Sequence, residues 1–307
     1  MSGVITTGNI SRLLVKGVKN VFGQAYEQHA QQCTMLFDTE QSRKAFEQDQ
    51  QFEGFGLAPV KLEGAGVAYD SQQEGFSPKF QNLTYAKGFI VTKEAMADNL
   101  YNLFEKRARA LAFSMQQTKE NVGANIYNRG FNSAFTMVGG DGVELFSDAH
   151  VNGPSDSTTF SNKLAVPAAL SEASLEDMLI QINEATDPRG LRIALRGERL
   201  IVPPKLGFEA ERILNSVLQN DTGNNAINAV RSTGMLPAGH MVNNYLTSNS
   251  AWFIKTNAPD GMKHMQRQEV DFDQDMDFGT SNARFKADER YSFGWSDPRG
   301  AYGSAGV

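Results

Sequence analysis

The sequence of 307 residues predicts a mixed α+β fold, in which extended segments and one long helix precede a smaller α/β unit. Three observations support this prediction. Apolar residues at spacings of three, four or seven run from 92 to 128 without a proline, which is typical of a long helix. Residues 53–91 and 284–300 contain the alternation of period two that is typical of strands. Residues 171–280 alternate helical patterns with short apolar runs.

Composition excludes several classes of protein. Hydrophobic residues make up 40% and charged residues 21%, which is typical of a globular chain. The net charge of −6 argues against a globally basic nucleic-acid binder. The single cysteine, Cys33, excludes an intrachain disulfide framework and a cysteine-based zinc cluster. No apolar run is long enough to span a bilayer, and no secretory signal is visible, so we expect a cytoplasmic protein without membrane contact.

The first 52 residues are predicted to form an arm and not a domain. Residues 10–22 carry an apolar helical stripe, with Arg12, Lys16 and Lys19 on the other side. Such a helix packs on another subunit or domain, or it touches a membrane or an acidic partner, and we favour the first interpretation. The polar stretch 24–51 has few apolar anchors, so we expect it to be extended.

Residues 53–91 are predicted to form a long β-hairpin. Alternation at 60–63 and 80–85 marks its two strands, and the polar segment 70–75 lies between them. A two-stranded hairpin is marginally stable alone, so we expect a neighbouring chain to support it.

The helix predicted over 92–128 begins after Thr92, a plausible N-cap residue, and would be roughly 54 Å long at 1.5 Å per residue. This length is typical of a bundle helix or a structural strut.

The α/β unit follows a loop-rich region at 130–170. Ser174 is predicted to cap its first helix, and the buried strand 200–202 stops at Pro203. Further elements are a helix at 206–218, an exposed polar loop at 219–225, and short strands near 241–246, 251–255 and 268–278. Residues 284–300 are predicted to form one or two aromatic strands, and the chain then ends in a Gly/Ser tail.

No set of residues converges on a catalytic site. His150 lies near Asp148 and could form an acid–base pair, but no third group is evident to orient it. The acids between Asp271 and Asp277 begin like a calcium loop, but Met276 stands where glycine is required and Asn282 where glutamate is required. We interpret these acids as a solvated strand face, with a weak cation site or an intersubunit Arg/Lys site as the alternative. The predicted protein is not an enzyme and has no catalytic, cofactor-binding or metal site.

The order of these parts, together with three stretches of sequence, points to a family. The stretches are LFSDAH at 145–150, DPRGL at 187–191 with LIVPP at 200–204 and AERIL at 210–214, and NARFKA at 282–287 leading into ERYSFGWSDPRG at 289–300. With these features the chain resembles the major capsid protein of tailed bacteriophages, which has the Hong Kong 97-type fold. More narrowly, it is similar to the Mu-like major head subunit. The resemblance covers most of the chain and is weakest over the first 50 residues.

The resemblance implies a division of the chain into five parts. They are an N-terminal arm at 1–52, an extended loop at 53–91, a peripheral domain with a spine helix at 92–170, an axial domain at 171–280, and a return strand to the peripheral domain at 281–307.

The implied function is structural. Copies of the chain would self-assemble into hexamers and pentamers of an icosahedral shell that encloses double-stranded phage DNA in the virion, after assembly in the cytoplasm of a bacterial host. Implied partners are other copies of the chain, scaffolding, portal and decoration proteins, and packaged DNA bound without sequence specificity. An encapsulin-like shell is the first alternative, and a metal-dependent enzyme using His150 and Asp148 is less favoured.

Contacts between subunits are predicted on the arm, the extended loop, the loop near the capsomer axis and the final strand. The residues are Arg12, Lys16, Lys61, Gln72, Gln73, Glu74, Lys79, Asn224, Asn225, Glu289 and Arg290. Some relatives cross-link a loop lysine to an asparagine of a neighbour, but no motif here identifies such a lysine.

Overall fold

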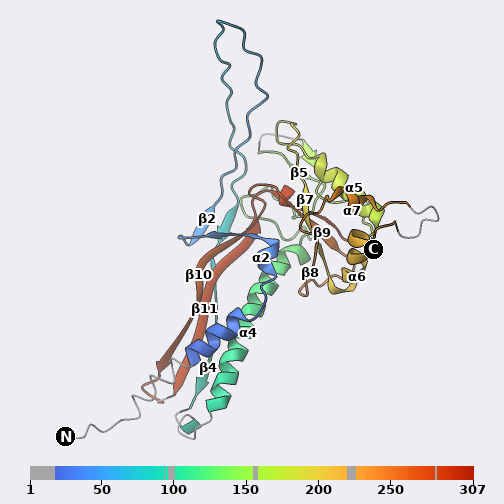
Figure 1. Cartoon of the computed structure of the whole chain (residues 1–307). Coiled ribbons are helices and arrows are strands. Elements are labelled where there is room, and N and C mark those ends of the chain that lie inside the picture. The colour runs from blue at the N-terminus through green and yellow to red at the C-terminus, as the bar shows by residue number, and fades with distance from the viewer. Residues whose placement is uncertain (1–17, 93, 96–100, 155–157, 220–225, 281) are drawn as a thin grey trace.

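The computed structural model describes residues 18–92, 94–95, 101–154, 158–219, 226–280 and 282–307 (Figure 1). It confirms a mixed fold of helices and sheets. Its two four-stranded sheets differ in shape: one is long and narrow, and the other is short and accompanied by helices. Arg12, Lys16, Asn224 and Asn225, four of the predicted contact residues, lie outside the described residues.

The long sheet has the order β1-β10-β11-β4. Its centre is an antiparallel hairpin of β10 (Met262–Met276) and β11 (Ala283–Trp295). β4 (Leu83–Val91) pairs antiparallel with β11, and β1 (Asp38–Gln41) pairs parallel with β10. β10 is longer than the predicted strand because it pairs with β11 over most of its length. β11 is one strand with strictly alternating burial over its first half, as the sequence pattern predicts.

The helix α4 (Tyr101–Asn128) lies along one face of this sheet (Figure 1). Its 28 residues span about 42 Å. Before it, the Thr92 hydroxyl accepts a hydrogen bond from the Ala95 amide at 3.3 Å, consistent with the predicted cap. Residues 96–100, which would join this turn to α4, lie outside the described residues.

The prediction that residues 24–51 are extended is confirmed only in part, because residues 24–27 and 33–36 are helical while 38–41 and 46–48 are strands. Residues 18–27 are helical, and Val18, Phe22 and Tyr26 are buried against α4 and the long sheet. α2 (Cys33–Leu36), β1 and β2 (Phe46–Gln48) follow. Apolar residues in this stretch are few, but Leu36 and Phe37 enter a core shared with Tyr127 and Trp295. A few apolar side chains are sufficient to hold this stretch, because the remainder of the chain provides the apolar surface against which they are buried.

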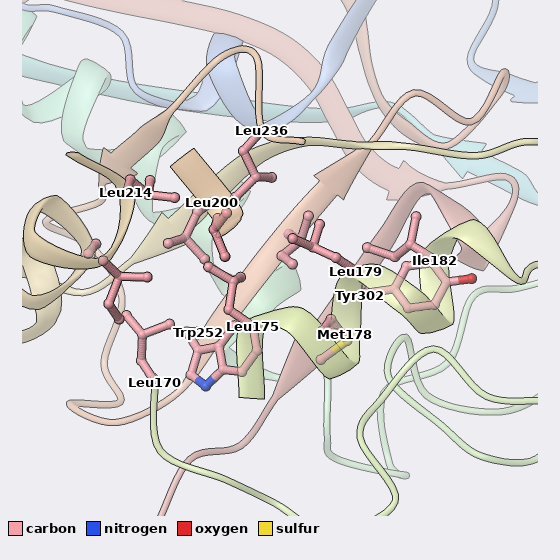
Figure 2. Packing of buried hydrophobic residues seen from close by; sticks show 14 of the residues in the cluster. Leu170, Leu175, Met178, Leu179, Ile182, Leu200, Leu214, Leu236, Trp252 and Tyr302 are labelled. Carbon is pink, nitrogen blue, oxygen red and sulfur yellow. The ribbon is translucent and has the colours of Figure 1, made fainter. Parts of the chain in front are cut away.

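The short sheet has the order β12-β9-β7-β8. Its strands are β12 (Ala301–Ser304), β9 (Trp252–Thr256), β7 (Gly197–Val202) and β8 (His240–Val242). The helices α5 (Glu172–Asn183), α6 (Gly207–Asn215) and α7 (Ala229–Thr233) accompany it. Figure 2 shows Leu175, Met178 and Leu179 of α5 gathered with Trp252 and Tyr302 in its core.

Two local predictions in this unit are corrected. The N-cap of α5 is Ser171, because its hydroxyl accepts from the Ser174 amide at 3.2 Å while the Ser174 hydroxyl accepts from the Ser171 amide. The predicted Gly/Ser tail is a strand, since β12 pairs with β9 and its four residues are buried. Small residues at this edge allow the close contact of Gly303 with the rings of Phe253 and Phe146.

Short elements complete the fold: β3 (Lys79–Gln81), β5 (His150–Val151), β6 (Thr159–Phe160) and the 3₁₀ turns η1 (Pro204–Leu206) and η2 (Pro298–Gly300). None of the helices in the described part of the chain is both long and apolar enough to cross a membrane.

Candidate assembly interface

A long loop between β2 and β3, residues 49–78, projects away from both sheets (Figure 1). Backbone hydrogen bonds close its root, from the Asp49 amide to the Pro78 carbonyl at 3.0 Å and from the Gln51 amide to the Phe76 carbonyl at 2.9 Å. The predicted β-hairpin was wrong in detail, because no ladder forms over residues 53–73 and β4 belongs to the long sheet. A hairpin with no layer to cover it is marginal, so pairing is confined to the root.

The projecting part of this loop carries exposed apolar side chains. Val60 and Tyr69 are 89% and 96% exposed. They belong to a set of large apolar residues whose side chains are mostly exposed: Phe52, Phe55, Leu57, Val60, Leu62, Val67 and Tyr69. A soluble chain rarely exposes so much apolar surface in one short stretch unless a partner covers it. We call this set the apolar loop face.

Ion pairs hold the root of the loop against the long sheet. The buried amine of Lys263 on β10 lies 2.6 Å from a carboxylate oxygen of Asp49, 2.7 Å from Asp260 and 3.2 Å from Glu40. Burial alone would raise the pKa of Asp49, but the hydrogen bonds from Lys263 and Ser296 outweigh it and lower that pKa. The loop therefore leaves from a fixed point beside β10.

Four predicted contact residues, Lys61, Gln72, Gln73 and Glu74, lie exposed on the projecting loop. Lys79 lies at its root, with its amine 4.1 Å from the centre of the Phe46 ring. Their role between subunits stays a prediction.

Glu289 was wrongly predicted to contact another subunit. Its side chain is buried, and its carboxylate lies 2.7 Å from the amine of Lys119 on α4. It also accepts hydrogen bonds from Tyr26 at 3.0 Å and Gln266 at 3.0 Å. A signal for this was present in the sequence, because Glu289 shares its strand face with Ala287 and Tyr291, which point to the core. Its neighbour Arg290 is half-buried on the opposite face.

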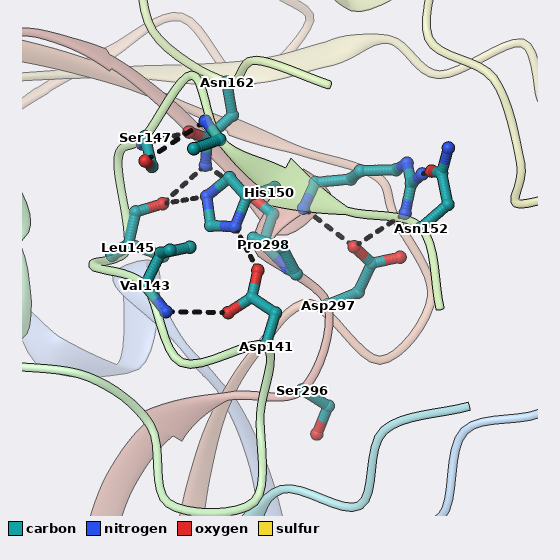
Figure 3. A network of polar contacts seen from close by, with 12 residues as sticks. Asp141, Val143, Leu145, Ser147, His150, Asn152, Asn162, Ser296, Asp297 and Pro298 are labelled. Carbon is teal, nitrogen blue, oxygen red and sulfur yellow. Dashed lines mark hydrogen bonds and ion pairs between the residues drawn. The ribbon is translucent and has the colours of Figure 1, made fainter. Parts of the chain in front are cut away.

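His150 does not pair with Asp148, an arrangement that the sequence allowed but did not favour. His150 is fully buried, its Nδ1 forms a short hydrogen bond with Asp141, and its Nε2 lies 3.1 Å from the Leu145 carbonyl (Figure 3). Because a carbonyl oxygen only accepts, Nε2 carries a proton. Asp148 instead pairs with Lys163 at 3.2 Å, and that hydrogen bond lowers the pKa of Asp148. Both ring nitrogens thus have partners within the chain, and His150 joins Asp141 to the Leu145 carbonyl.

Asn162 lies beside His150 in the same network (Figure 3). Its amide donates to the carbonyls of Leu145 at 2.6 Å, Pro298 at 3.0 Å and Ala301 at 3.1 Å, and its oxygen accepts from the Ser147 amide at 2.9 Å. It joins the LFSDAH and SDPRG stretches, which are far apart in sequence.

Replacing Asn162 with alanine is expected to lower the free energy of unfolding by about 3 kcal/mol, because it leaves buried backbone groups without partners. Urea denaturation of the purified chain measures this change. Asn121→Ala, at an exposed position on α4, is the control and is expected to change stability by less than about 0.5 kcal/mol. Equal effects of the two changes would contradict the role of Asn162.

The acids on β10 form an exposed strand face, as predicted. Asp271, Asp273 and Asp275 are exposed, while Phe272 between them is buried. Within the described residues, no group of three or more histidine, cysteine, aspartate or glutamate side chains could hold a metal ion.

Comparisons with known proteins agree with an assembly role. A family model described as phage capsid protein matches residues 78–304. No curated protein matches the sequence. Among solved structures, the chain is similar to the capsid of a native GTA particle, with a TM-score of 0.57, 9% identity and 87% coverage of each chain.

Two other solved structures share the fold. The procapsid protein of bacteriophage JBD30 has a TM-score of 0.51 and 14% identity, over 98% of this chain and 76% of that one. The virus-like particle from Pyrococcus furiosus has a TM-score of 0.50 and 11% identity, over 94% of this chain and 98% of that one. The chain therefore belongs to the phage capsid protein family, as its resemblance to the major capsid proteins of tailed bacteriophages predicts.

Proposed function

We propose that the chain is the repeating subunit of an icosahedral shell with the Hong Kong 97-type fold, built from hexamers and pentamers and enclosing double-stranded DNA. The observation that carries this proposal is the apolar loop face, which one chain leaves uncovered. Burial of this face against neighbouring copies would supply favourable free energy at every subunit of a closed shell. The narrower likeness to Mu-like head subunits stays a prediction.

The division into peripheral and axial units, which the resemblance implies, is part of this proposal, but two of its boundaries change. β10 and β11 are paired along their length, so both belong with α4, β1 and β4 in the peripheral unit, and the predicted boundary at 280 would divide a single hairpin. The short sheet with α5, α6 and α7 would form the axial unit. β12, the last strand of the chain, follows β11 and η2 and pairs with β9, so it would belong to this second unit.

The proposal has a direct test in the apolar loop face. Val60→Ser and Tyr69→Ser are expected to prevent or weaken assembly, since each contact would lose about 1.5 kcal/mol or more, roughly tenfold in affinity. Light scattering and negative-stain electron microscopy would measure particle formation. Because both side chains are almost fully exposed in the single chain, its own stability should change little.

Glu63→Ser, an exposed position beside Leu62 on the same loop that is not among the predicted contact residues, is the matched control and should assemble like the unmodified chain. Normal shells from Tyr69→Ser would contradict the role of this loop. A chain that forms no particles alone would be tested again with a candidate scaffolding protein, a partner that the family resemblance implies. Portal and decoration proteins, and assembly in a bacterial cytoplasm, are part of the same proposal.

The second candidate is an encapsulin-like shell, the alternative that the sequence leaves open, and the similarity to a virus-like particle is compatible with it. The two differ in what the shell contains. Particles purified from cells and treated with nuclease would retain protected DNA in the first case and protein cargo in the second.

A further inference from the structure

The turn at residues 187–191, one of the stretches singled out in the sequence, is held rigidly. The carboxylate of Asp187 accepts hydrogen bonds from the backbone amides of Arg189 at 2.9 Å and Leu191 at 2.7 Å. Gly190 adopts a φ of 78°, which is strained for other residues, and its amide bonds to the Asp187 carbonyl at 3.0 Å. These bonds present the Arg189 side chain in a defined direction.

Arg189 reaches the projecting loop. Its Nη1 donates to the carboxylate of Asp70 at 2.6 Å, and its Nη2 donates to the Ser71 carbonyl at 2.5 Å. The same Asp70 oxygen accepts from the Gly56 amide at 2.9 Å. Hydrogen bonds from Gly56 and Ser71, followed by the charge of Arg189, lower the pKa of Asp70. Asp70, on the returning half of the loop, is thus bonded to Gly56 on the outgoing half, and Arg189 binds this same carboxylate.

This contact lies two to three residues beyond the last backbone bond of the root, at Gly56, Asp70 and Ser71. The backbone bonds that close the root end with the Glu53 amide and the Gln73 carbonyl, and residues 57–69 are exposed throughout. A loop held at its root alone can pivot there. The contact with Arg189 is a second attachment, from a different part of the chain. It restricts the pivoting of the loop, because two fixed points define its direction.

We propose that Arg189 is a positioning residue that fixes the direction in which the apolar loop face projects from the chain. The importance of that direction rests on the proposed function, since docking on a second copy costs less when the loop is already oriented. The guanidinium is suited to this task because its planar fork donates to two acceptors at once. A lysine amine is a point charge and cannot reproduce both bonds in the same geometry.

The direction of the loop can be measured in the single chain by pulsed electron spin resonance. Spin labels would be placed on Glu63→Cys, at the far end of the loop, and Ala173→Cys, on the exposed face of α5. The native Cys33 is 1% exposed and would stay unlabelled under native conditions. Distances between the labels would be compared in the background of Arg189→Ala, Arg189→Lys and Arg192→Ala.

The expected result is one narrow distance distribution for the unmodified loop and loss of that peak in Arg189→Ala, with a broader distribution for Arg189→Lys. Arg192→Ala is the matched control, because Arg192 pairs with Glu184 at 3.6 Å and leaves the narrow peak in place. A distribution in Arg189→Ala that superimposes on the unmodified one would overturn the proposal. Failure of the chain to assemble would count against the proposed function and leave this result standing.

Discussion

Replacing Lys119 with methionine is expected to lower the free energy of unfolding by about 3–5 kcal/mol. Lys119 and Glu289 form an ion pair in which the two side chains are only 8% and 2% exposed. Removing one partner leaves the other charge buried without compensation, which costs far more than losing a surface pair. Chemical denaturation followed by circular dichroism would measure the change.

The double variant Lys119→Met with Glu289→Leu removes both charges together. It should recover part of the lost stability, because the uncompensated carboxylate is gone, while Tyr26 and Gln266 lose the acceptor that Glu289 provides. The control is Lys106→Met on the exposed side of α4, which should stay within about 0.5 kcal/mol. A double variant as unstable as the sum of its single changes would show that the two charges act independently.

Lowering the pH from 7 to 5 is expected to cost about 2 kcal/mol of stability through His264 alone. Burial, and then the positive charge of Lys119, lowers the pKa of this histidine from 6.5 to about 3. Its ring stacks on Phe293 at 4.4 Å, and its Nε2 is buried without a hydrogen-bond partner among the described residues. The folded chain therefore keeps His264 neutral, while the unfolded chain protonates it below pH 6.5.

Protonation of the unfolded state alone shifts the equilibrium toward unfolding as the pH falls from 6.5 to about 3, and above 6.5 the effect disappears. His264→Phe removes the titrating group while keeping an aromatic ring against Phe293. The difference in stability between the two proteins, measured by urea denaturation at each pH, should change by about 1.4 kcal/mol per pH unit below 6.5. His29→Gln removes an exposed imidazole and serves as the control. Parallel pH profiles for the unmodified chain and His264→Phe would rule out this origin.

Elements with a regular pattern of their own were predictable from the sequence. The helix ending at Asn128, the strand at 200–202 with its proline stop, and the alternation of β11 all follow from local spacing of apolar residues. The exposed position of the β10 acids follows from the same alternation. The family could be predicted as well, because it depends on the order of these elements and on short stretches that lie in turns and strands.

Partners distant in sequence could not be predicted. Glu289 forms hydrogen bonds with Tyr26, 263 residues away in the sequence, and with Lys119, 170 residues away. His150 pairs with Asp141 although Asp148 is closer in the sequence. The spacing of apolar residues predicts which face of a strand a residue occupies. It does not predict which side chains of the opposing layer that residue contacts. The contact residues on the loop, which were chosen for their polarity, stay a prediction, and the apolar loop face was not identified from the sequence.

The sequence by itself determined the class of the fold, the long helix and the main strands. These properties follow from periodicity and composition, which are local. Only the tertiary structure decided that the apolar residues between Val18 and Phe37 join the core, that β12 completes the short sheet, and that Arg189 contacts the projecting loop. Each of these depends on a surface that another part of the chain builds, so its free energy arises only when the distant segments meet.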